Sequence, residues 1–415
     1  MTQTKTIDTY LGEQFPTLGE SDHALFDNAG GSLPCRSAIE AISRYLIECP
    51  VQLGASYDLS QLAGHRLAKS TRDVMRLLDT RGGNELSDEQ IIFGSSTTQL
   101  INALCASLAP GFQAGDEIIV TNFDHESNIG AWRRLEERGL RVKEWQLNTD
   151  SLAACPADLE VLLSDKTRLV AFSHASNILG KALPVKALCE MIRAAGAISV
   201  VDGVAFAPHR PLELIDWGAD FYVFSFYKVF GPHCAVLYAR NERLSELSNL
   251  NHFFHHQASA ATKLQPGAYP YELAAGASGV TDYLRKLGQF SRGSDSGSIA
   301  DGWEFIAQRE RELTLRALEI LGAYEQVEIL GDASFSDARL PLFSFTARDR
   351  TPADAPAHFE KHKIALRYGH FYAHRLMTAL NLEPTSGVVR LSLAHYNTLS
   401  ELERFAEALE DWLTS

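Results

Sequence analysis

Two stretches of the sequence, AISVVDG (Ala197–Gly203) and DFYVFSFYKVFGPH (Asp220–His233), run from apolar residues into a charged side chain. Short apolar runs of this kind are typical of buried strands. Further runs occur near Ile91, Ile118, Val170 and Leu237, and segments with helical periodicity, such as 97–109 and 184–196, lie between them. Alternating strands and helices predict an α/β fold, with a mostly parallel sheet covered by helices on both faces.

The chain has 415 residues, which corresponds to about two domains. The regular pattern loosens after residue 240, and we expect loops and connections over 251–272 and 291–298. A helical stretch over 302–324, two apolar runs and a closing amphipathic helix over 399–413 then predict a smaller α+β domain. We expect an N-terminal segment, 1–25, that packs with the small domain, followed by a large domain over 26–299 and a small domain over 300–415.

The composition argues against several classes of partner. The sequence holds 38 basic and 52 acidic residues, a formal charge of -14, which repels nucleic acid and anionic lipid. The N-terminus has no signal-peptide core, and no apolar run approaches the roughly 20 residues that a membrane span requires. We therefore expect a cytoplasmic protein that binds neither nucleic acid nor membrane.

The cysteines and histidines do not predict a metal site. No CxxC pair occurs, and the histidine run at 252–256 has no matching carboxylate or cysteine spacing. The six cysteines are interpreted as reduced thiols: Cys35, Cys49, Cys105, Cys155, Cys189 and Cys234.

The polar residues after the apolar runs are the candidates for chemistry, because ligands of open α/β sheets bind at the carboxyl ends of the strands. Asp202 follows one run and Lys228 the next. Burial raises the pKa of an isolated carboxylate and lowers that of an isolated lysine, so both residues need a reason to be there. Pyridoxal phosphate provides one, since a lysine amine forms a Schiff base with its aldehyde and a carboxylate keeps its pyridine nitrogen protonated. A buried ion pair is the alternative.

Other residues at the strand ends fit the same cofactor. Ser96, Thr97 and Thr98 begin a predicted helix, where free N–H groups favour a phosphate, although a helix N-cap explains them equally well. His125 follows a strand and can lie flat on an aromatic ring, or can be a structural histidine. Asn177 can hydrogen-bond a ring hydroxyl, or can serve a turn.

Seven segments occur together in the order and approximate spacing of the class V aminotransferase family. They are FDNAGGS (26–32), GSSTTQLIN (94–102), DHESNIGAW (124–132), SHASNILG (173–180), VVDG (200–203), FYVFSFYKVFGPH (221–233) and RLSLAHYNT (390–398). The sequence most resembles the cysteine desulfurase and selenocysteine lyase branch. The resemblance implies a fold type I enzyme, pyridoxal 5'-phosphate bound in the large domain, an α-amino acid substrate and a homodimer.

The resemblance also implies roles for individual residues. Lys228 is similar to the Schiff-base lysine, which later moves a proton at the α-carbon, and Asp202 to the partner of the pyridine nitrogen. Arg390 resembles the arginine that holds the substrate's α-carboxylate, and Asn28 lies in a segment bordering the substrate pocket. The remaining cofactor contacts it implies are His125 stacked on the ring, Asn177 at the ring hydroxyl, and Ser96, Thr97, Thr98 and Ser225 at the phosphate.

The sequence departs from the family at four places. Tyr372, in ALRYGHFYAHRL (365–376), stands where the desulfurases carry the cysteine that accepts sulfur, and no cysteine follows Cys234. Ala205 replaces a glutamine or histidine near the ring. Tyr227 replaces a histidine, though its hydroxyl can reach the phosphate, and Ala275 replaces a threonine that contacts a neighbouring subunit's phosphate.

These departures favour β-elimination, as in a carbon–sulfur lyase, because this reaction needs no persulfide cysteine. Tyr372 or His370 then protonates the leaving group. One alternative is another class V reaction: transamination, epimerisation or the formation of a bond on an amino acid. A second is a cofactor-binding protein with little catalysis.

Overall fold

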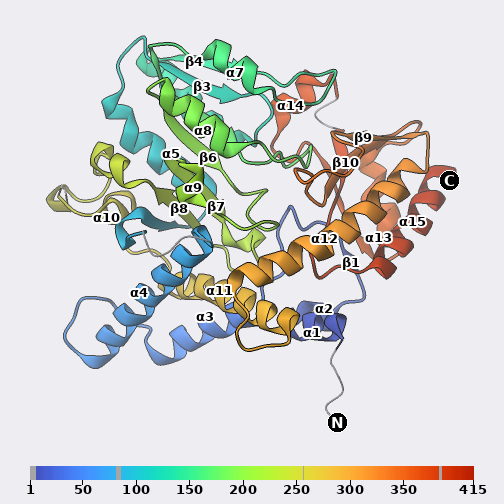
Figure 1. Cartoon of the computed structure of the whole chain (residues 1–415), viewed down its shortest axis with the longest axis horizontal. Helices are drawn as coiled ribbons and strands as arrows, with labels where there is room; N and C mark the ends of the chain where they lie inside the picture. The colour runs from blue at the N-terminus through green and yellow to red at the C-terminus, as the bar shows by residue number, and fades with distance from the viewer. Residues whose placement is uncertain (1–5, 81–85, 256, 383–385) are drawn as a thin grey trace.

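The computed structural model of the chain describes residues 6–80, 86–255, 257–382 and 386–415. Figure 1 shows a larger part built around a central sheet and a smaller part that contains the C-terminus. The long helices α11 (Tyr271–Arg292) and α12 (Ile299–Gly322) lead from the large part to the small part. Among the described residues, no helix is both long and apolar enough to cross a membrane.

The central sheet has seven strands in the order β2-β8-β7-β6-β5-β3-β4. Strands β4, β3, β5, β6 and β7 run parallel, whereas β8 is antiparallel to both β7 and β2. The strands are β2 (Ile91–Gly94), β3 (Glu117–Thr121), β4 (Arg141–Trp145), β5 (Thr167–Ser173), β6 (Ile198–Asp202), β7 (Phe221–Ser225) and β8 (Ala235–Ala239). All six strands predicted from the apolar runs are present, and only β4, which is mostly polar, was missed.

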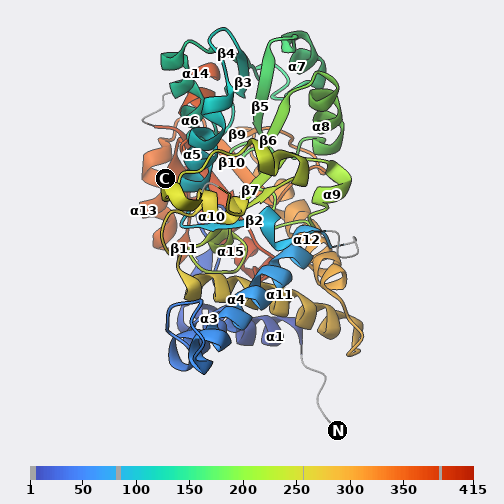
Figure 2. The same ribbon diagram turned by 90° about the vertical axis from the view of Figure 1, so that its left-hand side faces the viewer.

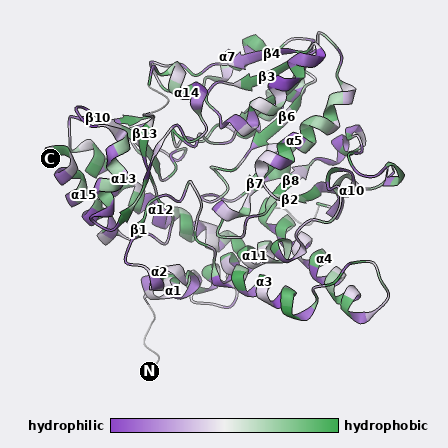
Figure 3. Ribbon diagram, turned by 180° about the vertical axis from the view of Figure 1, so that it is seen from behind, coloured by the Kyte–Doolittle hydropathy of each residue, from purple (hydrophilic) through white to green (hydrophobic). Residues whose placement is uncertain are grey.

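Alternate residues of the strands face two separate layers of helices. Ile118, Leu169 and Val223 pack on one face with α5 (Thr97–Leu108) and α6 (Gly130–Arg133). Val170 and Phe224 pack on the other face, which is covered by α8 (Val185–Ala194), α9 (Leu214–Trp217) and the long helices below. Figure 2 shows α5 and α6 on one side of the sheet and α8 and α9 on the other. Hydrophobic residues are concentrated in strands such as β3 and β6 (Figure 3).

Helix α11 (Tyr271–Arg292) connects the two parts of the molecule and was not predicted. It packs against α3 (Arg36–Glu48), α4 (Asp58–Leu78) and α12 (Ile299–Gly322). Its first residues fall in the stretch 251–272 that the sequence predicted to be a connection. The shorter helices of the large part are α7 (Pro156–Leu162) and α10 (Ala260–Leu264).

The smaller part is a four-stranded antiparallel sheet in the order β12-β13-β10-β9. Its strands are β9 (Val327–Leu330), β10 (Leu342–Ala347), β12 (Arg367–Gly369) and β13 (Val388–Ser392). Helices α12, α13 (Ala355–Glu360) and α15 (Leu399–Thr414) pack on it around a third apolar core, and α14 (His374–Ala379) follows β12. The predicted long helix and closing helix correspond to α12 and α15.

The N-terminal segment contacts both parts. Tyr10 of α1 (Ile7–Gln14) stacks on Phe290 of α11, with ring centroids 4.2 Å apart. After α2 (Thr17–Glu20), β1 (Ala24–Leu25) pairs in parallel with β11 (Ile364–Ala365) of the smaller part. The boundaries at 25/26 and 299/300 stay a prediction.

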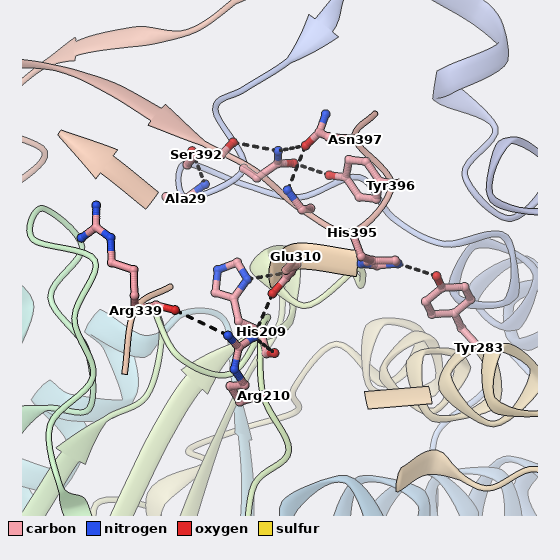
Figure 4. A network of polar contacts seen from close by, with 12 residues as sticks. Ala29, His209, Arg210, Tyr283, Glu310, Arg339, Ser392, His395, Tyr396 and Asn397 are labelled. Atoms are coloured by element: carbon pink, nitrogen blue, oxygen red, sulfur yellow. Dashed lines mark hydrogen bonds and ion pairs between the residues drawn. The ribbon is translucent and has the colours of Figure 1, made fainter. Parts of the chain in front are cut away.

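A buried ion-pair network also joins the two parts (Figure 4). Glu310 of α12 is fully buried, and its carboxylate contacts His209 Nδ1 at 2.9 Å and Arg210 Nη1 at 3.1 Å. Removing one partner would leave a buried charge without compensation, which costs about 3–5 kcal/mol. The network therefore fixes α12 against the loop that follows β6.

Candidate active site

Lys228 lies at the carboxyl end of β7, in a single 3-10 turn (Phe226–Lys228). Its side chain is buried, and desolvation together with the charge of Arg390 lowers its pKa to about 8, against the opposing attraction of Asp202. A lysine with this pKa has a substantial neutral fraction near pH 8. It can act as a nucleophile or as a base.

Asp202 ends the neighbouring strand β6, which pairs in parallel with β7. Burial raises the pKa of its carboxyl group to about 6, while the Val204 N–H, which donates to Oδ1 at 2.9 Å, and the charge of Lys228 act in the opposite direction. Because the parallel strands β6 and β7 end at the same edge of the sheet, the charged groups of Asp202 and Lys228 come together there.

The N-terminus of α5 faces the same edge. Ser96 is its N-cap, and its hydroxyl accepts from Gln99 N–H at 3.1 Å. Thr97 N–H donates to Ser225 Oγ at 3.2 Å, and the hydroxyl oxygens of Thr97 and Ser225 lie 2.8 Å apart. Clustered hydroxyls and N–H groups at a helix N-terminus are suited to a phosphate.

His125 follows β3, and its Nδ1 lies 2.8 Å from Ser127 Oγ. Burial lowers its pKa to about 4, with further contributions from the charges of Lys228 and Arg390, so the imidazole is neutral at physiological pH. A neutral ring can pack flat on another ring. Asn177, after β5, donates from its side chain to the Phe371 carbonyl at 2.9 Å.

These residues line two connected cavities. The inner one, about 70 Å³, is lined by Ser96, Thr97, Thr98, Ser127, Ser173, Ala175, Asp202, Val204, Ala205 and Ser225. The outer one, about 760 Å³, is bounded by Ala29, Gly30, Arg390 and the segment 366–372. His125, Asn177, Tyr227 and Lys228 line both cavities and so mark their boundary.

Arg390 lies on β13 of the smaller part and is almost fully buried beside the outer cavity. Its Nη2 contacts Asp27 Oδ1 at 3.2 Å and its Nη1 donates to the Asn177 carbonyl at 3.3 Å, while its buried Nε has no hydrogen-bond partner among the residues that the structure describes. The guanidinium also lies 3.7 Å over the Phe371 ring. Burial lowers its pKa to about 10, which still leaves it charged at neutral pH.

Asn28 differs from the sequence-based expectation. Its amide group donates to the carbonyls of Leu25 (2.8 Å) and Ser392 (2.9 Å), and its oxygen accepts from Tyr396. The Ser392, Tyr396 and Asn397 side chains that surround it are seen in Figure 4. The side chain thus holds the segment in place, and the following Ala29 and Gly30 line the outer cavity instead.

The other departures from the family are distributed over the site. Ala205 lines the inner cavity, and Tyr227 stacks on His233 with ring centroids 4.8 Å apart. Ala275 is buried within α11 and lines neither cavity. Tyr372 is exposed at the rim of the outer cavity, where its ring centroid lies 5.0 Å from that of His125 and its N–H donates to His370 Nδ1 at 3.0 Å.

Two acidic residues near the site were missed. Asp27 contacts Arg390, as described, and Arg367 Nη1 at 3.6 Å. Asp124 is buried, which raises its pKa to about 7, and it accepts hydrogen bonds from Ser173 Oγ (2.6 Å) and Asn128 (3.0 Å). Its position directly before His125, after an apolar run, was the available signal.

The donor set fits pyridoxal phosphate. A buried amine, a buried carboxylate, a neutral imidazole and a hydroxyl-lined helix N-terminus surround one cavity, and each matches a different group of the cofactor. Arg390, which lines the adjoining outer cavity, carries a guanidinium, a group suited to binding a carboxylate. The fold and the site thus define a fold type I enzyme that depends on pyridoxal phosphate.

The chain belongs to the class V aminotransferase family, whose sequence profile matches residues 24–405. It is 37% identical over 408 residues to the aminotransferase-like protein FGM3 of Gibberella zeae, covering 96% of each chain. It is 31% identical to the cysteine desulfurase-like protein ustD of Aspergillus flavus, covering 96% of this chain and 89% of that one. The apo structure of a Thermococcus onnurineus cysteine desulfurase superposes with a TM-score of 0.86 at 25% identity, covering 99% of both chains. The predicted α/β fold type I and the pyridoxal phosphate cofactor are confirmed.

Proposed function

We propose that this enzyme catalyses β-elimination on an α-amino acid with a sulfur leaving group on its β-carbon. For L-cysteine the balanced reaction is cysteine plus water giving pyruvate, ammonia and hydrogen sulfide. The observation that carries the proposal is the outer cavity itself, which Lys228, His370 and Tyr372 all line. In the described parts of the chain, no residue lining either cavity is a cysteine.

Lys228 supplies the base in this proposal. Bound pyridoxal phosphate stabilises negative charge that develops at the substrate's α-carbon. The Lys228 amine, with its pKa of about 8, takes the α-proton at neutral to slightly alkaline pH. Asp202 would hold a proton on the cofactor's pyridine nitrogen, and the neutral His125 ring would pack against the cofactor ring.

Arg390 orients the substrate. Within the described part of the chain its buried Nε has no partner, whereas Nη1 and Nη2 are held by the Asn177 carbonyl and Asp27. A substrate carboxylate supplies the missing acceptor and brings the α-carbon toward Lys228. The Phe371 ring, under the guanidinium, keeps its plane fixed.

The leaving group requires a proton donor at the rim. The Tyr372 backbone is fixed because its carbonyl accepts from Glu126 N–H at 2.8 Å, while its side chain stays exposed to the outer cavity. His370 lies beside it. Either side chain can protonate a departing thiolate, which itself leaves readily because its conjugate acid has a pKa of about 8.5.

The test is the carbon product from L-cysteine and from L-cystine, with pyridoxal-phosphate-saturated enzyme. We expect equal amounts of pyruvate and ammonia, and a loss of about 10²–10⁴-fold in the Lys228→Ala variant. Tyr372→Phe should lower turnover while leaving cofactor binding unchanged. The absence of pyruvate from both substrates would reject the proposal, and undiminished turnover in Tyr372→Phe would remove that residue from it.

Transamination is the second candidate, favoured by the similarity to the aminotransferase-like protein of Gibberella zeae. It uses the same base and carboxylate-binding residue but returns the proton to the cofactor. The same incubations distinguish the two reactions, because transamination converts the cofactor to its amine form and releases no ammonia.

We further propose that the enzyme is a homodimer. Apolar side chains are exposed on α3 and α4, which are joined by an ion pair between Arg66 and Glu48. They are Ile39, Leu46, Ile47, Leu59 and Leu62. Contiguous exposed apolar side chains mark interaction surfaces, and a second copy of the chain covers such a surface by symmetry.

We propose the cytoplasm as its compartment. All six cysteines are free thiols, five of them buried. Reduced thiols persist in reducing compartments. Detection of the native enzyme in a fraction with oxidised thiols would contradict this assignment.

A further inference from the structure

We infer a transition-metal site, suited to Zn²⁺, on the smaller part of the molecule, formed by His358, His362 and Asp411. His358 belongs to α13, His362 to the turn that follows it, and Asp411 to α15. Figure 1 shows α13 and α15 next to each other near the C-terminus. The site is separate from both cavities, since none of the three residues lines them.

The backbone places the two histidines on one side of the helix. His358 and His362 are four residues apart, and backbone bonds from Lys361 N–H to His358 O (3.1 Å) and from His362 N–H to Phe359 O (3.0 Å) continue the helical turn past Glu360. Residues four apart in a helix lie on the same face. The two imidazole rings are accordingly 5.4 Å apart, at an interplanar angle of 32°.

The ligand atoms already approach a metal-binding arrangement. Asp411 Oδ2 lies 3.4 Å from His358 Nε2 and 3.3 Å from His362 Nε2, and the three atoms lie within 4.8 Å of one another. Tetrahedral zinc with bonds of about 2.0–2.1 Å separates its ligands by about 3.3 Å. The two separations that involve Asp411 therefore match this value. A small rotation of the histidine rings would bring the two histidine nitrogens to the same separation.

The chemistry of the ligands selects the metal. Two imidazole nitrogens and one carboxylate oxygen suit zinc and its neighbours in the first transition row, and do not suit Mg²⁺ or Ca²⁺, which prefer oxygen ligands. A water molecule completes the fourth position, because Asp411 is exposed and the site opens to solvent.

The alternative is a pair of imidazoles that hydrogen-bond Asp411 without a metal. His358 Nε2 also lies 3.2 Å from the Ala408 carbonyl, a contact made by an Nε2–H donor. Metal binding must release that proton, since a ligating imidazole presents its lone pair. A metal would therefore displace this hydrogen bond, whereas a hydrogen-bonded pair takes up no metal.

The metal would connect a wall of the outer cavity to the C-terminal helix. Pro356 of α13 lines that cavity, and His358 lies two residues further along the same helix. A metal shared by α13 and α15 restrains both, and it stabilises the folded chain by mass action. The sequence carries half of the signal as a His-x3-His pair (His358 and His362), whereas Asp411 is brought in only by the fold.

The experiment uses the full-length, pyridoxal-phosphate-loaded enzyme, stripped with a chelator and titrated with Zn²⁺ in a calorimeter. We expect one tight site per chain, weakened at least tenfold in both His362→Ala and Asp411→Asn, with a rise in Tm on zinc addition that these variants lose. His252→Ala, in the other histidine cluster, is the matched control and should keep the site. Co²⁺ substitution should give the visible absorption of a tetrahedral complex.

Two results would overturn the inference. One is the absence of a tight zinc site in the wild-type enzyme at pH 8. The other is a tight site that survives in His362→Ala and Asp411→Asn or disappears in His252→Ala. Circular dichroism of each variant establishes that a lost site is not a lost fold.

Discussion

At the scale of single residues, the balance of charges around Lys228 governs how the cofactor is attached. Only the neutral amine attacks an aldehyde, and Lys228 is protonated below its pKa of about 8. We expect the rate of covalent attachment of pyridoxal phosphate to apo-enzyme to rise with pH and to level off above about pH 8. An ordinary lysine would continue to gain reactivity up to about pH 10.4. Stopped-flow absorbance of the bound cofactor measures this profile.

Arg390 allows a test of the pH at which this attachment rate reaches half of its maximum, the midpoint of the profile. Its positive charge lowers the pKa of Lys228, second only to burial, so Arg390→Gln should move the midpoint to higher pH. Lys186→Gln, which removes an exposed lysine paired with Asp216, should leave the midpoint unchanged. A wild-type midpoint near pH 10 would contradict the burial argument.

The sequence predicted Lys228, Asp202 and His125 as site residues because each is a polar residue near the end of an apolar run. The fold brings them together since parallel strands end at one edge of the sheet. Asp27 and Asp124 also follow apolar residues, but the sequence alone does not show which groups they contact. Their roles depend on contacts with Arg390, Arg367 and Ser173, which lie far away in the sequence. Asn28 shows the reverse: its segment reaches the cavity, but its own side chain is used to hold the backbone.

At the scale of elements, hydrogen bonds between Thr97 and Ser225 join the N-terminus of α5 to the end of β7, where we propose that the cofactor's phosphate binds. A hydrogen bond to a charged group contributes about 1.5–3 kcal/mol. We therefore expect Ser225→Ala to weaken pyridoxal phosphate binding about 10–100-fold, measured by equilibrium dialysis of the apo-enzyme.

Ser107→Ala is the matched control for this prediction. Ser107 lies on the same helix, but its hydroxyl donates to the Ser248 carbonyl at 2.7 Å, away from both cavities. Its loss should lower stability and leave cofactor affinity unchanged. Equal losses of pyridoxal phosphate affinity in both variants would contradict this prediction. They would show that the affinity depends on the stability of the whole helix and not on hydrogen bonds at its N-terminus.

Helix α11 explains why part of the fold could not be predicted. It contains Gly276, Gly279 and Gly288, and glycine lowers the helix propensity of the segment. In the structure the glycines permit close helix packing: a Cβ on Gly279 would lie 2.5 Å from Ala38 Cα of α3. The cost of glycine in a helix, about 1 kcal/mol, is offset by tertiary contacts that no local pattern reveals.

At the scale of the whole molecule, the exposed apolar side chains of α3 and α4 make a prediction about assembly. Ile47 is 80% exposed on α3, and burying such a side chain stabilises an interface by about 1.5–3 kcal/mol. In a homodimer each substitution acts twice, once from each subunit. We therefore expect the wild-type enzyme to sediment as a dimer and Ile47→Asp to shift it toward monomer by at least tenfold in dissociation constant, measured by analytical ultracentrifugation. Val161→Asp is the matched control, since Val161 is 86% exposed on α7, beyond the α3–α4 surface. A monomeric wild-type enzyme, or an equal shift in both variants, would contradict a dimer formed through α3 and α4.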